Sequence, residues 1–246
     1  MATRIGLITD LHYRGVVPGT AKNLKRESRK AGELLRRSLE EFSRRRVDAL
    51  IVAGDCVDDE TQPGVLEDVA ALGELLAASG LRVILVPGNH DPAPETFYGA
   101  LPAALRPPRY QRVGECEVLT FGEDVSTEGT EQALRSATAM AEMETVLREP
   151  GPVTLVVQHY VVFPDHEGPG YNHTYQNAAQ IRGLMEGSPR RVVSVSGHYH
   201  RGYPLTEHNG VRYFTGRALC EAPYPYYVIE VEGEEVRVEE APLAGE

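Results

Sequence analysis

Cysteine and positive charge are scarce in this chain of 246 residues, and long apolar runs are absent. The three cysteines are odd in number and far apart, which argues against a disulfide framework. No stretch approaches the roughly 20 apolar residues that a membrane-spanning helix needs. An apolar run already begins within a few residues of Met1, so no secretion signal is recognisable. We therefore expect a cytoplasmic protein with no membrane partner.

The length fits a single domain spanning residues 1–246, and the deficit of basic residues makes this domain acidic. Lysine and arginine total 25 against 36 aspartate and glutamate residues, for a formal net charge of −11. Such a balance disfavours non-specific binding to nucleic acid. The basic segment 22–46 is an exception, but its apolar residues follow helical spacing, which favours a solvated amphipathic helix. A phosphate-facing patch at Lys22 and Lys25 is the alternative.

The order of the expected elements favours an α/β fold. Strand, helix, strand, helix and strand alternate in the first third of the chain, with helices near 24–46 and 64–79. Such alternation is typical of parallel strands joined by crossover helices. Near the end of the chain, Asn209-Gly210 and Gly233 each separate two apolar segments, which predicts hairpins. We therefore expect a second, more antiparallel sheet packed on the first.

Five short polar motifs each follow an apolar run that is expected to be a strand. In open α/β sheets, ligands bind just beyond the carboxyl ends of the strands, so these motifs are expected at one edge. Seven of their side chains, two carboxylates, one amide and four imidazoles, form an inventory that suits two metal ions. The motifs are Asp10-Leu11-His12, Gly54-Asp55, Gly88-Asn89-His90-Asp91, His159 and Gly197-His198-Tyr199-His200.

Spacing within the motifs predicts how the ligands converge. Asp10 and His12 are two residues apart, so on an extended backbone both side chains project from the same face. The two histidines of the last motif have the same spacing. A bridge between two ions needs a ligand with two oxygens. We expect Asp55 to supply it, because Gly54 permits a close approach of the backbone.

The donor atoms and their charges indicate the metal and the substrate. Asn89 adds a neutral oxygen, and the mixed nitrogen and oxygen set suits Mn, Fe, Zn, Co or Ni better than Ca. Two divalent ions bring four positive charges, of which Asp10, Asp55 and a bridging hydroxide remove three. The net positive centre that remains suits an anionic phosphoryl group, whose hydrolysis paired metals promote.

Together, the ordered motifs resemble those of the calcineurin-like metallophosphoesterase superfamily. The resemblance implies a four-layer αββα sandwich, with two central mixed β-sheets flanked by helices. It implies that His90 contacts the phosphate or the leaving-group oxygen and that Asp91 orients His90. It also implies two metal sites that share one carboxylate, the first held by Asp10, His12, Asp55 and His200 and the second by Asp55, Asn89, His159 and His198.

Shorter similarities narrow the expected substrate. The motif spacing and the short length resemble the class III cyclic-nucleotide phosphodiesterases. The segment Asp10–Tyr13 and the Tyr171-Asn172 pair are similar to manganese-dependent ADP-ribose/CDP-alcohol diphosphatases. We therefore expect hydrolysis of a phosphodiester or phosphoanhydride bond in a small nucleotide-like substrate, by in-line attack of a metal-bridging hydroxide while His90 assists the leaving group. Stacking tyrosines and phosphate-pairing side chains form the expected substrate rim: Tyr13, Arg14, Tyr171, Asn172, Tyr175 and Arg217.

Several alternatives stay open at this point. A phosphomonoesterase or a nuclease of the same superfamily would use the same metal chemistry, although the acidic charge disfavours a nuclease. A non-catalytic scaffold would keep the fold without its metals. The rim residues are equally well explained as ordinary surface residues. Cys56 is expected to pack in the core rather than bind metal, and Asp58 to cap a turn or orient a ligand.

Overall fold

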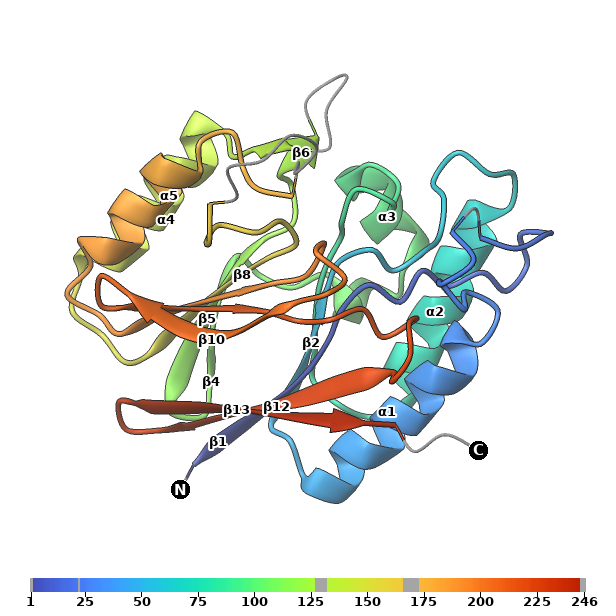
Figure 1. Cartoon of the computed structure of the whole chain (residues 1–246), viewed down its shortest axis with the longest axis horizontal. Helices are drawn as coiled ribbons and strands as arrows, with labels where there is room; N and C mark the ends of the chain where they lie inside the picture. Colours follow the sequence, from blue (N-terminus) through green and yellow to red (C-terminus); the bar gives the residue numbers. More distant parts are fainter. Residues whose placement is uncertain (1, 22, 127–131, 166–172, 244–246) are drawn as a thin grey trace.

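The computed structural model describes residues 2–21, 23–126, 132–165 and 173–243. In Figure 1, strands lie at the centre and helices cover both outer sides. Within the described residues, none of the helices combines the length and the apolar character needed to cross a bilayer. The layers of helix, sheet, sheet and helix form the four-layer α/β sandwich that the family resemblance implies. Helices α1 (Ala31–Arg45), α2 (Val65–Ala78) and α3 (Pro94–Ala100) lie on one side, and α4 (Ala137–Arg148) and α5 (Ala178–Glu186) on the other.

The first sheet contains the parallel strands of the N-terminal half, in the order β13-β12-β1-β2-β3. β1 pairs in parallel with β2, and β2 with β3, whereas β12 runs antiparallel to β1 and to β13. The parallel pairs are connected through α1 and α2, as the alternation of strand and helix predicts. The strands are β1 (Thr3–Ile8), β2 (Ala49–Ala53), β3 (Val83–Val86), β12 (Pro225–Glu232) and β13 (Glu235–Pro242).

The second sheet has the order β10-β11-β9-β8-β5-β4. Its four central strands are parallel, and both edge strands run antiparallel to their neighbours. This sheet is therefore not more antiparallel than the first, which corrects the sequence-based expectation. A short 3₁₀ turn, η1 (Ala103–Leu105), precedes it, and β6 (Val125–Ser126) pairs with β7 (Ala133–Leu134) outside it. The strands are β4 (Tyr110–Val113), β5 (Cys116–Phe121), β8 (Thr154–Gln158), β9 (Val192–Ser196), β10 (Tyr203–His208) and β11 (Val211–Thr215).

The two C-terminal hairpins belong to different sheets, which corrects the expectation that both build the second one. The hairpin of β10 and β11, around Asn209-Gly210, lies in the second sheet, whereas β12 and β13 pair with β1 of the first. Turn residues specify the pairing inside a hairpin, but the buried side chains decide where the hairpin docks. Ile229 and Val231 of β12 pack in the core between the two sheets.

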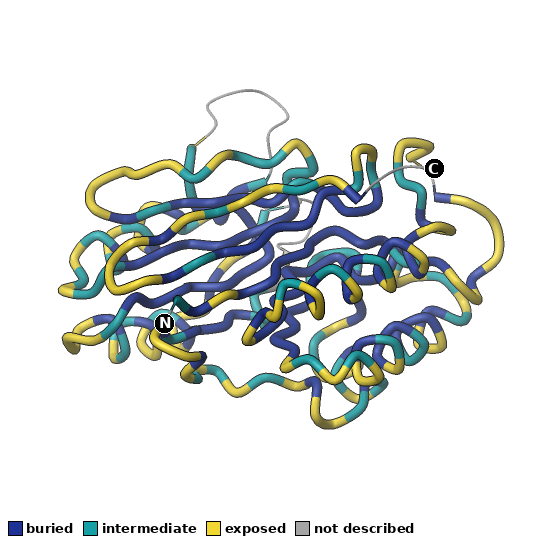
Figure 2. The backbone as a smooth tube through the Cα atoms, turned by 90° about the horizontal axis from the view of Figure 1, so that it is seen from below, coloured by how far each residue is buried: buried dark blue, intermediate teal, exposed yellow. Residues whose placement is uncertain are grey.

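Apolar side chains fill the three spaces between the four layers. Leu7 and Ile51 of the first sheet pack with Leu155 and Val193 of the second. Two further clusters separate the first sheet from α1 and α2, and the second sheet from α4 and α5. Figure 2 shows the strands mostly buried and the helices exposed along one side. Because both faces of the central strands are covered, polar functional groups gather at the strand ends.

Helix α1 is amphipathic, as predicted, but it begins at Ala31 rather than near residue 24. Leu35 and Phe42 are buried against the sheet, while basic residues cover the solvent side. The preceding residues do not continue the helix, because the Arg29 guanidinium donates hydrogen bonds to backbone carbonyls of the loop 14–19. Lys25 therefore lies in a loop, and Lys22 lies outside the described residues.

Candidate metal centre

The seven candidate ligands follow the carboxyl ends of five parallel strands, drawn from both sheets. Because the sheets pack face to face, the two sets of strand ends meet at the same edge of the sandwich. The hydrogen bond from Gly197 N–H to the carbonyl of His159, at 2.9 Å, joins two of the loops. The ligands are Asp10 and His12 after β1, Asp55 after β2, Asn89 after β3, His159 after β8, and His198 and His200 after β9.

The ligand pairs converge through left-handed turns rather than along extended strands, which corrects the geometry inferred from their spacing. The backbone φ is 54° at Asp10, 47° at His12 and 68° at His198. A residue with a side chain pays roughly 1–2 kcal/mol there, because its Cβ approaches a carbonyl oxygen. Hydrogen bonds hold the turns, since His12 N–H donates to the carbonyl of Asp55 at 2.9 Å and His198 N–H to the Asp10 carboxylate at 3.1 Å. Backbone strain is thus concentrated where ligands are presented.

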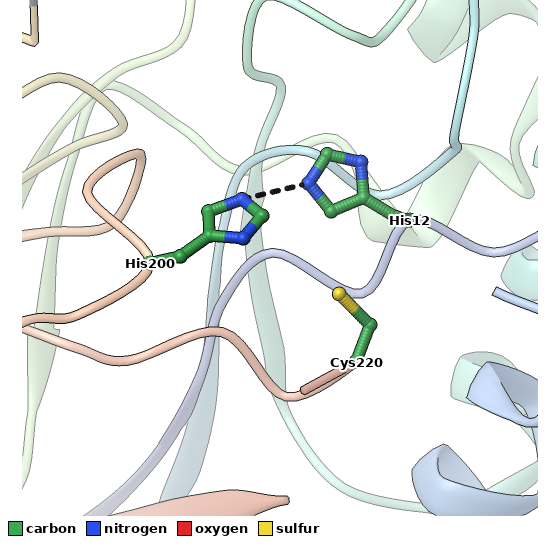
Figure 3. Close-up of side chains that lie close together, drawn as sticks. All are labelled: His12, His200 and Cys220. Carbon is green, nitrogen blue, oxygen red and sulfur yellow. Dashed lines mark hydrogen bonds between the residues drawn. The ribbon is translucent and has the colours of Figure 1, made fainter. Parts of the chain in front are cut away.

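Four side chains form a first cluster, which we call site 1: Asp10, His12, Asp55 and His200. The Nε2 atoms of His12 and His200 face each other at 3.1 Å, as Figure 3 shows. His12 Nε2 lies 3.5 Å from Asp55 Oδ2, and His200 Nε2 lies 3.6 Å from Asp10 Oδ1. One donor atom from each side chain therefore surrounds a common point, with all four atoms within 4.8 Å of one another.

A second cluster, site 2, consists of Asp55, Asn89, His159 and His198. His159 Nε2 lies 3.2 Å from Asp55 Oδ1 and 3.2 Å from Asn89 Oδ1. The His198 ring lies against the His159 ring, with 4.9 Å between their centroids. Asp55 thus turns Oδ2 towards site 1 and Oδ1 towards site 2, which is the geometry of a bridging carboxylate.

Burial and charge decide the protonation of both sites. Burial lowers the pKa of His12 and of His198 well below the usual value, so both rings are neutral and offer a lone pair. Burial acts to raise the pKa of Asp55, but the charges of His159 and His90 outweigh it and hold this pKa well below its usual range. Burial likewise acts against a charged His159, yet Asp55 raises its pKa to about 9. The anionic Asp55 therefore attracts positive charge on both sides.

These residues fit a pair of metal ions. His198 Nε2 is buried and has no hydrogen-bond partner among the described residues, and buried polar atoms without a partner are rare. The Nε2 atoms of His12 and His200 point at each other, so a cation between them would have both as ligands. Nitrogen and oxygen donors in this mixture suit a divalent first-row ion.

Glu221, which no sequence motif singled out, orients His200. Its Oε1 accepts a hydrogen bond from His200 Nδ1 at 2.7 Å, which leaves Nε2 for site 1. The same hydrogen bond lowers the pKa of Glu221, so its carboxylate is ionised. Glu221 lies in the loop after β11, another parallel strand that ends at this edge. The strand-end rule would have pointed to this loop, although not to the residue.

His90 is held by a backbone carbonyl, which corrects the expectation that Asp91 orients it. His90 Nδ1 donates to the carbonyl of Asp58 at 2.7 Å. The Asp91 carboxylate instead accepts three backbone N–H groups, from Gly88 at 2.7 Å, Cys56 at 3.0 Å and Val57 at 2.9 Å. Asp91 therefore ties the loop after β3 to the loop after β2. The resemblance implied a different contact, but the Asp91 carboxylate and the His90 ring have separate backbone partners.

Two cysteines lie near the ligands. Cys220 is fully buried, and its Sγ lies near the rings of His12 and His200 (Figure 3), where it could join site 1. Burial, followed by the charges of Asp10 and Glu221, raises the pKa of the Cys220 thiol, and a protonated thiol is a poor ligand. The two carboxylates of site 1 are the better anionic donors. Cys56 packs in the core, as expected.

A cavity of about 250 Å³ opens above the two sites. Asp55, Asn89 and the last two ligand histidines lie in its wall, together with His90. Three cationic side chains stand around it, and an aromatic wall comes from His173 and Tyr199, whose rings lie 5.2 Å apart. Of this outer ring, sequence reasoning named only Lys25, as part of the alternative phosphate-facing patch. The ring consists of Asn23, Lys25, Arg26, His173, Tyr199 and Arg201.

Most residues of the expected substrate rim lie elsewhere. Arg14 is buried, and its guanidinium pairs with Asp58 at 2.7 Å, while Tyr13 packs against the core; neither lines the cavity. Tyr175 is buried, and its hydroxyl donates to Asp124. Arg217 lines a smaller neighbouring cleft that includes His200, and it pairs with Glu240 at 3.0 Å. Tyr171 and Asn172 lie outside the described residues.

The family of the chain follows from a comparison with family models. A model described as calcineurin-like phosphoesterase matches residues 3–202, a span that contains both ligand clusters. The chain therefore belongs to the calcineurin-like phosphoesterase family. Family and ligand clusters together indicate a dinuclear metal site and a metal-dependent phosphoric ester hydrolase. A search of curated protein sequences found no significant match.

Solved structures share the fold at low sequence identity. A dimetal phosphatase from Danio rerio is 14% identical with a TM-score of 0.72, over 98% of this chain and 99% of that one. A protein from Thermus thermophilus is 14% identical with a TM-score of 0.65, over 99% of this chain and 100% of that one. A putative 5'-nucleotidase from Staphylococcus aureus is 14% identical with a TM-score of 0.64, over 100% of this chain and 55% of that one.

Proposed function

We propose that this phosphohydrolase cleaves a phosphodiester or phosphoanhydride bond in a small nucleotide-like substrate. The observation that carries the proposal is the cavity itself, whose wall contains both a carboxylate shared by two ligand clusters and His90. A leaving group that departs as an alkoxide or a phosphate needs a proton or a positive charge beside it. We assign that role to His90 Nε2, because His90 lies in the cavity wall with Asp55.

In this proposal, the candidate ligands divide between two ions as the family resemblance implies. When bound, two ions supply Lewis acidity and a water of lowered pKa for attack on phosphorus. The donor set suits Mn, Fe, Zn, Co or Ni. Asp10, His12, Asp55 and His200 would hold one ion, and Asp55, Asn89, His159 and His198 the other.

His90 is the proposed acid. The carbonyl of Asp58 holds the proton on Nδ1, so the second ring proton of a charged His90 resides on Nε2, towards the cavity. From that atom it passes to the departing oxygen. Asp91 contributes indirectly, because its three backbone hydrogen bonds fix the loop that carries Asn89 and His90.

Hydrolysis of matched chromogenic substrates tests the proposal. The protein is loaded in turn with Mn, Fe, Zn, Co and Ni, and bis(p-nitrophenyl) phosphate is compared with p-nitrophenyl phosphate. We expect faster turnover of the diester, and loss of both activities in Asp55→Asn. Faster turnover of the monoester with every metal would favour the phosphomonoesterase alternative, which the name of the Staphylococcus aureus relative supports.

A further inference from the structure

The segment between β1 and α1 is a braced loop. The Arg29 guanidinium donates to the carbonyls of Gly15 at 2.9 Å and of Gly19 at 2.9 Å. Asp68 of α2 accepts the N–H groups of Gly15 at 3.0 Å and Val16 at 2.5 Å. These side-chain contacts replace the hydrogen bonds of regular structure, so the loop has a defined shape.

The far end of this loop is fixed beside the cavity. Glu27 N–H donates to the carbonyl of Cys220 at 2.8 Å, and the Tyr224 hydroxyl donates to the Glu27 carboxylate. Arg26 N–H closes a turn onto the carbonyl of Asn23 at 3.0 Å. Arg26 is therefore presented from a turn that is anchored to the loop carrying Glu221.

The guanidinium of Arg26 lies in the part of the cavity that contains His90. Its Nη1 lies 3.4 Å from His90 Nε2, and its Nε is buried without a hydrogen-bond partner. Among the described residues, Arg26 forms no ion pair, whereas Arg14 of the same loop pairs with Asp58. Desolvated donors without an acceptor are unfavourable unless an anion occupies the position.

Positive charge gathers around this position although the chain is acidic. Lys25 and Arg201 stand at the cavity with Arg26, in a chain whose net charge is −11. The acidic residue Glu221 is engaged by His200. The metal sites and His90 already serve the phosphoryl group under attack, so the additional cations exceed what a singly charged diester needs.

We propose that Arg26 binds a second phosphoryl group of the substrate, next to the one under attack, and thereby favours phosphoanhydrides over simple diesters. This inference rests on the proposed function and narrows it. A guanidinium donates two parallel hydrogen bonds to phosphate oxygens. In the reaction, one P–O bond forms from water and the bridging P–O bond breaks. Its electron pair stays on the departing phosphate oxygen, and each product phosphate receives one of the two water protons.

Substrate pairs and Arg26 variants test this assignment. The anhydrides are ADP-ribose and ADP-glucose, and the diester is the p-nitrophenyl ester of thymidine 5'-monophosphate. We expect Arg26→Ala to lower kcat/KM for the anhydrides by about 10- to 100-fold and for the diester by less than about 3-fold, with Arg26→Lys intermediate. Arg44→Ala is the matched control, because Arg44 is an exposed α1 residue that carries the same charge away from the cavity.

Equilibrium binding supplies a readout independent of turnover. Calorimetry of a methylene-bridged ADP analogue and of AMP should show that Arg26→Ala weakens the analogue about 10-fold more than AMP, while Arg44→Ala changes neither. The assignment would be overturned if Arg26→Ala lowered kcat/KM equally for anhydride and diester, or lowered the affinities for the analogue and for AMP equally. A wild-type preference for the diester would also overturn it and leave the proposed function standing. If the wild-type protein hydrolysed neither substrate class, both the Arg26 assignment and the proposed function would be wrong.

Discussion

Gly54→Ala is the substitution whose effect follows most directly from the geometry. Gly54 has a φ of 90°, and an added Cβ would lie 2.5 Å from Cγ and 2.8 Å from Cβ of His159. Ordinary contact begins at 3.4 Å, so the His159 ring must move by about 1 Å. Its Nδ1 now donates to the carbonyl of Ala53 at 2.8 Å, and its Nε2 lies 3.2 Å from Asp55. Both contacts are lost by such a shift.

The magnitude has three parts. A side chain in the left-handed region costs roughly 1–2 kcal/mol, the lost hydrogen bond about 1 kcal/mol, and overpacking about 1–3 kcal/mol. Gly80→Ala is the matched control, because Gly80 has a φ of 69° and nothing within 4 Å of an added Cβ. Gly80→Ala therefore has only the cost of a side chain in the left-handed region. We therefore expect Gly54→Ala to be less stable than Gly80→Ala by about 2–4 kcal/mol.

Urea unfolding and metal analysis measure the two consequences. Metal–nitrogen distances tolerate shifts of only about 0.2 Å, so a displaced His159 no longer serves site 2. Gly54→Ala should bind one metal per chain and Gly80→Ala two. If both variants unfold at the same urea concentration and both bind two metals, the close approach of Gly54 to His159 is not what positions this ligand.

The remaining predictions concern the roles of single side chains. Asp55→Asn leaves the two sites without their shared charge, so the metal content measured by elemental analysis and the turnover rate should fall together. His90→Ala should keep both metals but lower kcat by about 10²- to 10⁴-fold, most of all for poor leaving groups; metal loss as large as in Asp55→Asn would contradict this role. Asp91→Ala removes the acceptor of three backbone N–H groups. Thermal unfolding should therefore show a free energy of unfolding lower by about 1–3 kcal/mol, whereas His90→Ala should leave it unchanged. Glu221→Ala should weaken metal binding at site 1 by about 10-fold in calorimetric titration. Glu221→Gln keeps an acceptor for His200 and should bind metal with the affinity of the unmodified protein. If the two variants bind metal with equal affinity, Glu221 does not orient His200.

Elements with a strong local pattern were predicted closely. The helix expected near 64–79 is α2 (Val65–Ala78), and the hairpin expected around Asn209-Gly210 joins β10 and β11. The helix expected from residue 24 begins at Ala31, because side-chain contacts of Arg29 and Asp68 organise the preceding loop. Such contacts cross between elements, and periodicity within one segment does not report them.

The candidate site likewise contains residues that local motifs predict and residues that only contacts between distant elements bring in. The motifs identified side chains that the structure brings together, because each follows a strand and the strands end at one edge. Arg26 and Glu221 belong to no motif, and they reach the site only through turns anchored by distant residues. The expected contact between His90 and Asp91 came from the family resemblance, whereas in the structure the Asp91 carboxylate accepts backbone N–H groups instead.

The sequence by itself determined the α/β class, the strand ends and the chemistry of the ligands, since those depend on local periodicity and residue type. The tertiary structure alone decided that Asp55 faces both clusters and that His12 meets His200, which lies 188 residues away. It also decided that an arginine without an ion-pair partner among the described residues stands beside His90. Such contacts depend on how two sheets pack, and packing is a property of the whole chain rather than of any segment.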